Sequence, residues 1–272
     1  MVSRINYKPS IISYLDILGF KNIVDNFNET EIRDILESFK RWSETDKELK
    51  SSLEMKLTNF SDTIVRSTNI ISKGNRSFQD GILYNELLDL TLIQCSLIEK
   101  GVLIRGSVVI GQISHTKDYI FGPGLNKAYQ LENDIAIFPR IIIDPLIIND
   151  LEEIPLLKRS GHTTEEEKKY LKGFISESND GLWYLDYLKG MSRLALFKNY
   201  LYLLEDHKKL ILNLSDKYND IDNFDKLSQK IGWLVKYHNN VVNSIKSSFF
   251  KEEGVKKKSY LISQKECPTL VD

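Results

Sequence analysis

The sequence predicts an α+β fold, in which a sheet packs against helices on one face and is followed by a helical extension. Runs of apolar and β-branched residues alternate with segments of helical periodicity over the first 190 residues, a pattern typical of a sheet covered by helices. From Met191 onward the chain has neither Gly nor Pro until Gly232, and its apolar residues recur at spacings of three and four. We therefore expect two units: residues 1–190, and residues 191–272 as a helical hairpin with a polar tail.

Five regions of the first unit have the length and composition of strands: residues 10–19, 53–69, 103–113, 136–144 and 182–188. The polar break at residues 59–62 divides the second region into two strands that meet in a turn. In the third region Gly111 is a candidate fold-back point. In the fourth, Pro139 indicates an edge position or a bulge, because proline cannot donate to a sheet ladder.

Helical periodicity follows between these strands. It extends over residues 30–49 and 82–100, where Gly101 supplies the stop, and a glycine turn opens into a helix within residues 122–133. In the second unit, apolar stripes run through residues 194–214 and 224–245. The stripes allow two interpretations, packing on the chain's own first unit or contact with a second copy in a dimer.

Charge and cysteine content exclude several classes of protein. The 272 residues include 37 Lys and Arg against 38 Asp and Glu, a formal net charge of −1, which argues against a main role in binding nucleic acid or anionic membranes. Cys95 and Cys267 form no CxxC motif, so neither a disulfide framework nor a cysteine zinc site is expected. No apolar run reaches the roughly 18 residues of a membrane helix, and the start lacks a signal peptide. We expect a soluble, cytoplasmic protein.

Two aspartates interrupt apolar strand sequences. Asp16 lies within SIISYLDILGF, and Asp62 lies within NFSDTIV. Taken singly, Asp16 is compatible with a helix N-cap and Asp62 with an ordinary hairpin turn. Taken together on adjacent strands, they could share a pair of divalent cations, because burying a lone carboxylate is costly and hard oxygen ligands suit Mg²⁺ or Mn²⁺.

Two further features favour an anion. Arg105 interrupts the apolar strand LIRGSVVIG; its guanidinium is compatible with a salt bridge at the strand end or with a bound phosphate. Gly122-Pro123-Gly124 precedes a helix, and free amides at a helix start attract anions.

The segments YLDILGFKNIV, FSDTIV, LIRGSVVIG and YIFGPGLNKAYQLEN resemble, in order and spacing, a class III nucleotide cyclase domain over residues 10–188. The resemblance implies a ferredoxin-like α/β sandwich whose active sites form between two catalytic domains, so that the protein would act as a homodimer. It implies a two-metal mechanism, with two Mn²⁺ or Mg²⁺ ions per site. Asp16, Asp62 and the backbone of Ile17 would bind these ions.

The resemblance also assigns the substrate contacts. The backbone of Leu18, Gly19 and Phe20 would lie against the triphosphate of a nucleoside triphosphate, and Arg105 would bind it. Asn126 would orient the ribose from the partner chain. The two positions that select a purine would be Thr58 and Tyr119, and neither carries the residue found in adenylyl or guanylyl cyclases.

The departures are informative. At the position of the family's transition-state arginine this chain has Gln130. Arg140 is a candidate to replace the missing arginine. The lost purine code, the segment AYQLE…FPRIIID and the C-terminal helices resemble the bacterial cyclases of the Pycsar anti-phage system. That resemblance implies cyclic UMP made from UTP, acting on a separate effector. The alternatives are cyclic CMP, a purine cyclase with an unusual pocket, and a non-catalytic cyclase-like regulator, which Gln130 prompts and the paired aspartates oppose.

Overall fold

A single mixed sheet organises the chain. The computed structural model describes residues 7–43, 47–217 and 224–267, and within them the strand order is β2-β3-β1-β4-β6-β8-β7, with β5 paired to β4. The strands are β1 (Lys8–Ile17), β2 (Lys56–Phe60), β3 (Thr63–Asn69), β4 (Ile104–His115), β5 (Ile120–Phe121), β6 (Ile141–Ile143), β7 (Ile175–Glu177) and β8 (Trp183–Leu185). Strand β1 pairs antiparallel with both β3 and β4, and β6 runs parallel to β4.

The first half has the predicted ferredoxin-like arrangement. Helices lead from β1 to β2 and from β3 to β4, and the four strands lie in the spatial order β2-β3-β1-β4, which is the βαββαβ pattern. The helices of this part are α1 (Phe20–Asn26), α2 (Glu29–Ser43), α3 (Lys47–Ser52), α4 (Lys73–Phe78) and α5 (Ile82–Ile98). The predicted α+β fold is confirmed.

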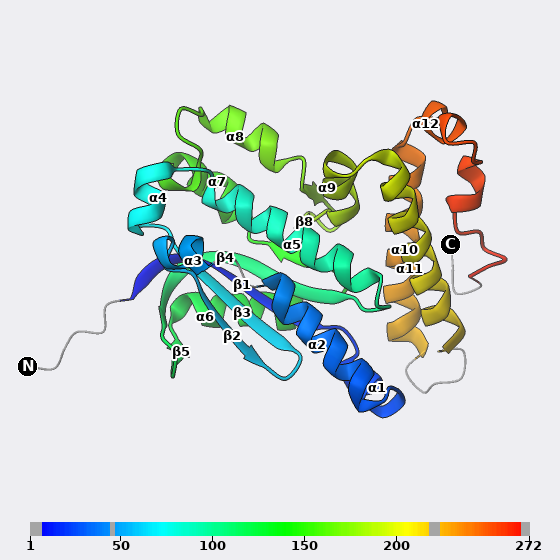
Figure 1. Ribbon diagram of the computed structural model, residues 1–272, viewed down its shortest axis with the longest axis horizontal. Coiled ribbons are helices and arrows are strands. Elements are labelled where there is room, and N and C mark those ends of the chain that lie inside the picture. Colours follow the sequence, from blue (N-terminus) through cyan, green and yellow to red (C-terminus); the bar gives the residue numbers. More distant parts are fainter. Residues whose placement is uncertain (1–6, 44–46, 218–223, 268–272) are drawn as a thin grey trace, which may run out of the picture.

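Helices cover both faces of this sheet, so the expectation of helices on one face is wrong. On the first face α2 and α5 pack against a large core that includes Leu15 and Ile64. On the second face α6 (Pro123–Gln130) packs on β1 and β4, where Ile12 and Val109 bury Ala128 (Figure 1). Strand β1 is therefore covered from both sides, which explains why apolar residues occupy both of its faces.

Two details of the strand prediction are wrong. Strand β4 runs straight through Gly111 without folding back. A Cβ atom on Gly111 would lie 2.6 Å from the Cα of Gly124, so this glycine lets α6 approach the sheet closely. Strand β6 is not an edge strand, because β4 and β8 flank it. Pro139 precedes β6 and so leaves its ladder intact.

Several short elements follow α6 that the sequence patterns did not indicate. A π-helix, η1 (Leu131–Ile135), continues α6 directly, and α8 begins with a capping box between Thr163 and Glu166. The remaining elements of this part are α7 (Leu146–Glu153), the 3₁₀ turn η2 (Pro155–Leu157), α8 (Thr164–Leu171) and α9 (Tyr187–Leu194). The unit boundary predicted at residue 190 falls within α9.

The C-terminal region is the predicted helical hairpin. Helices α10 (Phe197–Lys217) and α11 (Phe224–Ser244) lie side by side (Figure 1) and are followed by α12 (Ser247–Glu252) and the 3₁₀ turn η3 (Lys257–Tyr260). Helix α10 contacts α5 and α9, and Leu204 and Leu234 belong to the same core as the sheet. Of the two interpretations of the stripes, packing on the chain's own first unit is thus observed. No helix among the described residues is long and apolar enough to cross a membrane.

A buried chain of hydrogen bonds joins the hairpin to α9 and η3. The Tyr187 hydroxyl lies 2.8 Å from His207 Nε2, His207 Nδ1 lies 3.0 Å from His238 Nδ1, and His238 Nε2 lies 2.7 Å from the Tyr260 carbonyl. Because a carbonyl only accepts, His238 Nε2 must donate, and in the neutral ring its Nδ1 accepts from His207. The Tyr187 hydroxyl then donates to His207 Nε2. The chain cannot be satisfied when both imidazoles are protonated, because His207 Nδ1 and His238 Nδ1 would then both be donors.

Acidification should therefore destabilise the protein. Burial lowers the pKa of His238 to about 4 and also lowers that of His207, whereas an unfolded histidine titrates near about 6.5. As the pH falls below about 6.5 the unfolded chain takes up protons first. The stabilisation is complete above that pH and is lost as the pH falls toward 4. Urea unfolding between pH 7 and pH 4 measures this loss, and His238→Gln should show a shallower dependence; equal slopes would contradict the account.

Candidate active site

The register of the central strand places Asp16 between two polar partners. Asp16 on β1 lies opposite Thr63 on β3 and opposite Arg105 on β4. The Thr63 hydroxyl donates to Asp16 Oδ1 at 3.2 Å, and Arg105 Nε lies 3.3 Å from Asp16 Oδ2. Asp16 retains a side-chain exposure of 20%, so the carboxylate is accessible at the end of the strand. The structure thus places Asp16 and Arg105 in one cluster, joined by an ion pair.

Asp62 joins this cluster from the β2–β3 turn. The turn is tight, with Ser61 at a positive φ of 55°, and the Ile17 amide donates to the Asp62 carbonyl at 3.1 Å. Burial raises the pKa of Asp16 most, the Asp62 charge raises it further, and Arg105 lowers it. The two carboxylates are therefore close enough to repel each other, and a single arginine does not cancel the combined effect.

A third carboxylate, Glu132, also forms an ion pair with Arg105. Its Oε1 lies 2.8 Å from Arg105 Nε, and its side chain is 4% exposed. Burial raises the pKa of Glu132, Arg105 lowers it, and the Asp16 and Asp62 charges raise it. Both ion pairs of Arg105 use Nε, and among the described residues no hydrogen bond occupies its two terminal amino groups. Those groups form a fork that could bind a phosphate bidentately.

The sequence patterns did not single out Glu132. It sits in the π-helix η1, four residues after the buried Ala128, and positions four apart share a helix face. That spacing predicts that the Glu132 carboxylate faces inward, and it is the sequence signal from which Glu132 could have been found. The π-helix itself could not be predicted, and such bulges often occur at functional sites.

The segment after β1 offers fewer free amides than expected. The Ile17 amide is bonded to Asp62, and the Leu18 amide donates to the Leu103 carbonyl at 2.8 Å. Gly19 has a φ of 74° and precedes α1, which begins at Phe20. Amides in the first turn of a helix have no partner within that helix, so Phe20 is better placed than Leu18 to meet an anion.

Asn126 and Gln130 are exposed on α6. The candidate substitute for the missing arginine, Arg140, is wrong: its side chain is 1% exposed, pairs with Asp180 and lies over the ring of Phe138, with the guanidinium carbon 5.2 Å from the ring centroid. This guanidinium is part of the packing under Trp233 and cannot reach a substrate.

Of the two positions that the resemblance assigns to base selection, Thr58 lies on the second face of the sheet, opposite Val65. Thr58 Oγ1 is 2.8 Å from His115 Nε2, and His115 Nδ1 is 2.7 Å from Ser67 Oγ. Tyr119 is 72% exposed in the loop before β5. Burial lowers the pKa of His115 to about 4, so this ring is neutral at physiological pH. His115 was not among the sequence candidates, because it carries no metal-ligand spacing.

The donor chemistry of the cluster fits hard divalent cations. Asp16 and Asp62 are electrostatically coupled carboxylates, and Mg²⁺ and Mn²⁺ prefer oxygen ligands. Among the described residues no three His, Cys, Asp or Glu side chains are arranged to hold a metal ion. The set therefore consists of two side chains, to which the resemblance adds the backbone of Ile17.

Comparison with known proteins gives only distant likenesses. No model of a known protein family matches the chain, and no curated protein sequence matches it. Among solved structures, the adenylyl cyclase CyaB from P. aeruginosa is 14% identical over 54% of this chain and 82% of its own, with a TM-score of 0.38. The guanylyl cyclase Cya2 is 13% identical over 66% and 92%, with a TM-score of 0.38.

A third solved structure is the monomeric guanylyl cyclase domain of the RhoGC fusion protein from the aquatic fungus Blastocladiella emersonii. It is 12% identical over 66% of this chain and 95% of its own, with a TM-score of 0.38. All three are adenylyl or guanylyl cyclases. At these TM-scores the likeness carries no argument about function, which has to be argued from the site.

Proposed function

We propose that the protein is a nucleotide cyclase, which converts a nucleoside triphosphate into a 3′,5′-cyclic nucleotide and pyrophosphate. The observation that carries the proposal is the cluster at the end of β1. Two coupled carboxylates, Asp16 and Asp62, lie beside an arginine whose terminal amino groups are open. A site that combines cation ligands with a phosphate receptor suits a metal-bound triphosphate.

Each residue has a distinct task in this proposal. Asp16, Asp62 and the Ile17 backbone would hold two Mn²⁺ or Mg²⁺ ions, which when bound supply Lewis-acid activation and charge neutralisation. Arg105 would bind the triphosphate through its fork, oriented by Glu132. The ribose 3′-oxygen then attacks the α-phosphorus, its proton leaves to solvent, and the bond to the leaving pyrophosphate breaks. Gly19 and Phe20 would line the phosphate path.

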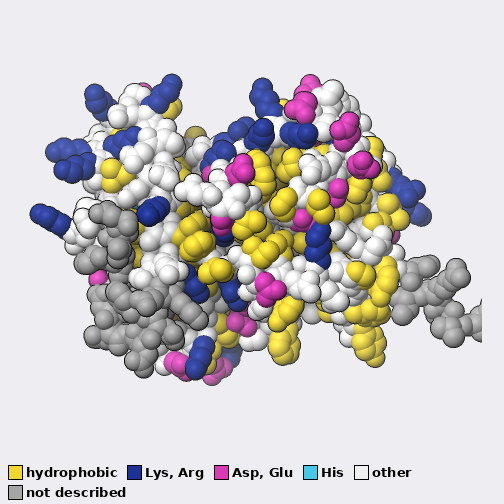
Figure 2. Space-filling model, turned by 180° about the vertical axis from the view of Figure 1, so that it is seen from behind, with side chains coloured by type: hydrophobic (Ala, Val, Ile, Leu, Met, Phe, Trp, Pro, Cys, Tyr) yellow, Lys and Arg dark blue, Asp and Glu magenta, His cyan; other side chains and the backbone are white. Residues whose placement is uncertain are grey.

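A homodimer would complete the site. Asn126 is exposed on α6, so a second copy of the chain could reach it. Exposed apolar side chains occur on α6 and after η1, among them Tyr129 at 50% and Ile137 at 55%. Figure 2 shows, from behind, patches of hydrophobic side chains between charged ones. Contiguous exposed apolar surface often marks a protein interface.

The substrate we favour is UTP. Thr58, bonded to His115, and the exposed Tyr119 carry neither purine code, and a tyrosine would narrow the pocket toward a smaller base. CTP is the close alternative. The resemblance to the Pycsar cyclases supports a role in anti-phage defence, in which cyclic UMP activates a separate effector. Gln130, with Arg140 buried, favours a second candidate function, a non-catalytic cyclase-like regulator.

The products distinguish these possibilities. The purified protein should be incubated separately with ATP, GTP, CTP and UTP in the presence of Mn²⁺, and the products identified by mass spectrometry. We expect one cyclic pyrimidine nucleotide, cyclic UMP. A cyclic purine would overturn the pyrimidine assignment while keeping the reaction. The absence of product from all four nucleotides would support the regulator.

Asp62→Asn is the matched control for that experiment. It removes one charge from a partly exposed turn and should abolish turnover, while circular dichroism and the elution volume on size exclusion stay unchanged. A variant that remains active would contradict the metal assignment.

Glu132→Gln should separate substrate binding from chemistry. The change keeps the size of the side chain but removes the charge that holds Arg105 Nε, so the KM for the nucleotide should rise by about tenfold, the equivalent of about 1.4 kcal/mol. The kcat should change little, because Asp16 and Asp62 are intact. Glu165→Gln, on the exposed start of α8, should leave both constants unchanged. A loss of kcat as complete as that of Asp62→Asn would contradict a positioning role.

A further inference from the structure

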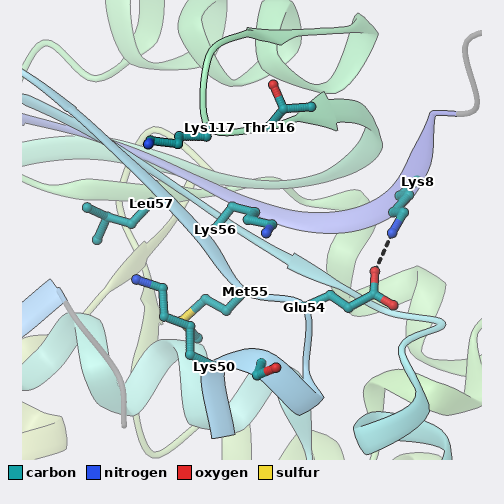
Figure 3. A pocket seen from close by; sticks show the side chains of 9 residues that line it. Lys8, Lys50, Glu54, Met55, Lys56, Leu57, Thr116 and Lys117 are labelled. Carbon is teal, nitrogen blue, oxygen red and sulfur yellow. Dashed lines mark hydrogen bonds and ion pairs between the residues drawn. The ribbon is translucent and has the colours of Figure 1, made fainter. Parts of the chain in front are cut away.

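A cavity lined by lysines lies at the end of β1 opposite to Asp16. It has a volume of about 610 Å³ and is lined by Lys8, Lys50, Lys56 and Lys117, together with Glu54 and Thr116 among others. The lysines come from four separate segments, namely β1, α3, β2 and the loop after β4 (Figure 3). Since Lys8 and Asp16 are eight residues apart on one extended strand, the two sites are separated by roughly 26 Å.

The cavity continues across the second face of the sheet. A neighbouring cavity of about 360 Å³ shares Lys8, Lys56 and Lys117 and extends to His115 and Asn69. His115 adds no charge there, because burial lowers its pKa to about 4. The shared lysines therefore set the charge of both cavities.

Among the described residues, acidic side chains balance the positive charge of this cavity only in part. Glu54 is the one acidic residue in the lining of the larger cavity. It is already paired with Lys8 (Figure 3) and accepts a hydrogen bond from Asn69 at 3.0 Å; these bonds lower the pKa of Glu54. Within residues 7–43, 47–217 and 224–267, no carboxylate lies within ion-pair distance of Lys50, Lys56 or Lys117. Three lysines thus line the cavity with no ion-pair partner among the described residues.

This concentration of charge contrasts with the rest of the chain. The formal net charge is −1, so the lysines reflect no general basic excess, and an extended nucleic-acid surface is not favoured. A cavity of several hundred Å³ matches a small molecule. A monoanion would neutralise one of the three lysines, whereas linked phosphoryl groups can meet all three, and lysine is a common phosphate ligand.

We propose that this cavity binds a polyphosphate anion, either free pyrophosphate or the phosphate chain of a nucleotide, at a site separate from Asp16 and Asp62. Lys50, Lys56 and Lys117 would contact the phosphoryl oxygens, and the Lys8–Glu54 pair would form the rim. The proposal holds whether or not the Asp16 cluster catalyses cyclisation, because no residue is shared between the two.

Calorimetric titration of the full chain tests this site. Inorganic pyrophosphate is titrated in the presence of EDTA, which prevents divalent cations from recruiting it to Asp16 and Asp62. We expect saturable binding, weakened at least about tenfold in Lys56→Ala/Lys117→Ala, because each charge-assisted hydrogen bond is worth roughly that much. The matched control, Lys236→Ala/Lys251→Ala, removes two exposed lysines from the C-terminal helices and should bind like the wild type.

Two further arms complete the test. Asp62→Asn should retain pyrophosphate binding, which separates this site from the proposed active site. A titration with UTP in EDTA distinguishes the two sources of the phosphate. If UTP binds more tightly than pyrophosphate, the ligand is a nucleotide; if it binds equally or more weakly, the ligand is the free anion. Failure of the wild type to bind either compound, or equal binding by the Lys56/Lys117 variant with an unchanged thermal unfolding midpoint, would overturn the proposal.

Discussion

The pairing of β1 with β3 on one side and β4 on the other is the constraint on which the remaining structure depends. This double register sets Asp16 between Thr63 and Arg105 and aims it at the face covered by α6. If the register of β1 shifted by one residue, the Asp16 side chain would point into the core under α5, and its apolar neighbours would move to the opposite face. The apolar residues on both faces of β1 therefore hold the polar cluster in place, and stability and site geometry share one cause.

Much of the fold could be predicted because local periodicity reports burial. The helix expected at residues 82–100 is α5 (Ile82–Ile98), and the strand expected at residues 10–19 is β1 (Lys8–Ile17). The prediction failed where distant segments meet. The close approach of Gly111 to Gly124 has no local signature, and the three-residue β6 is too short to show alternation. Helix α6 consequently could not be placed on the second face.

The candidate site was predictable to a similar extent. Asp16, Asp62 and Arg105 each interrupt an apolar run, which is a signal visible in one dimension. Glu132 has no such signal, since its role depends on a π-helix that brings it to Arg105. The lysine-lined cavity was invisible for another reason: its residues are scattered from position 8 to position 117, and only the sheet topology brings them together. In the sequence these lysines cannot be distinguished from ordinary solvent-exposed lysines.

The central claim, that Asp16 and Asp62 together bind a divalent cation, is tested most directly by electron paramagnetic resonance of Mn²⁺. The free ion has an intense spectrum that is lost on binding, so a titration measures affinity without requiring turnover. The account predicts saturable binding to the wild-type protein, strengthened by a nucleoside triphosphate, and its loss in both Asp16→Asn and Asp62→Asn. Binding of equal affinity in the wild type and in both variants would contradict it.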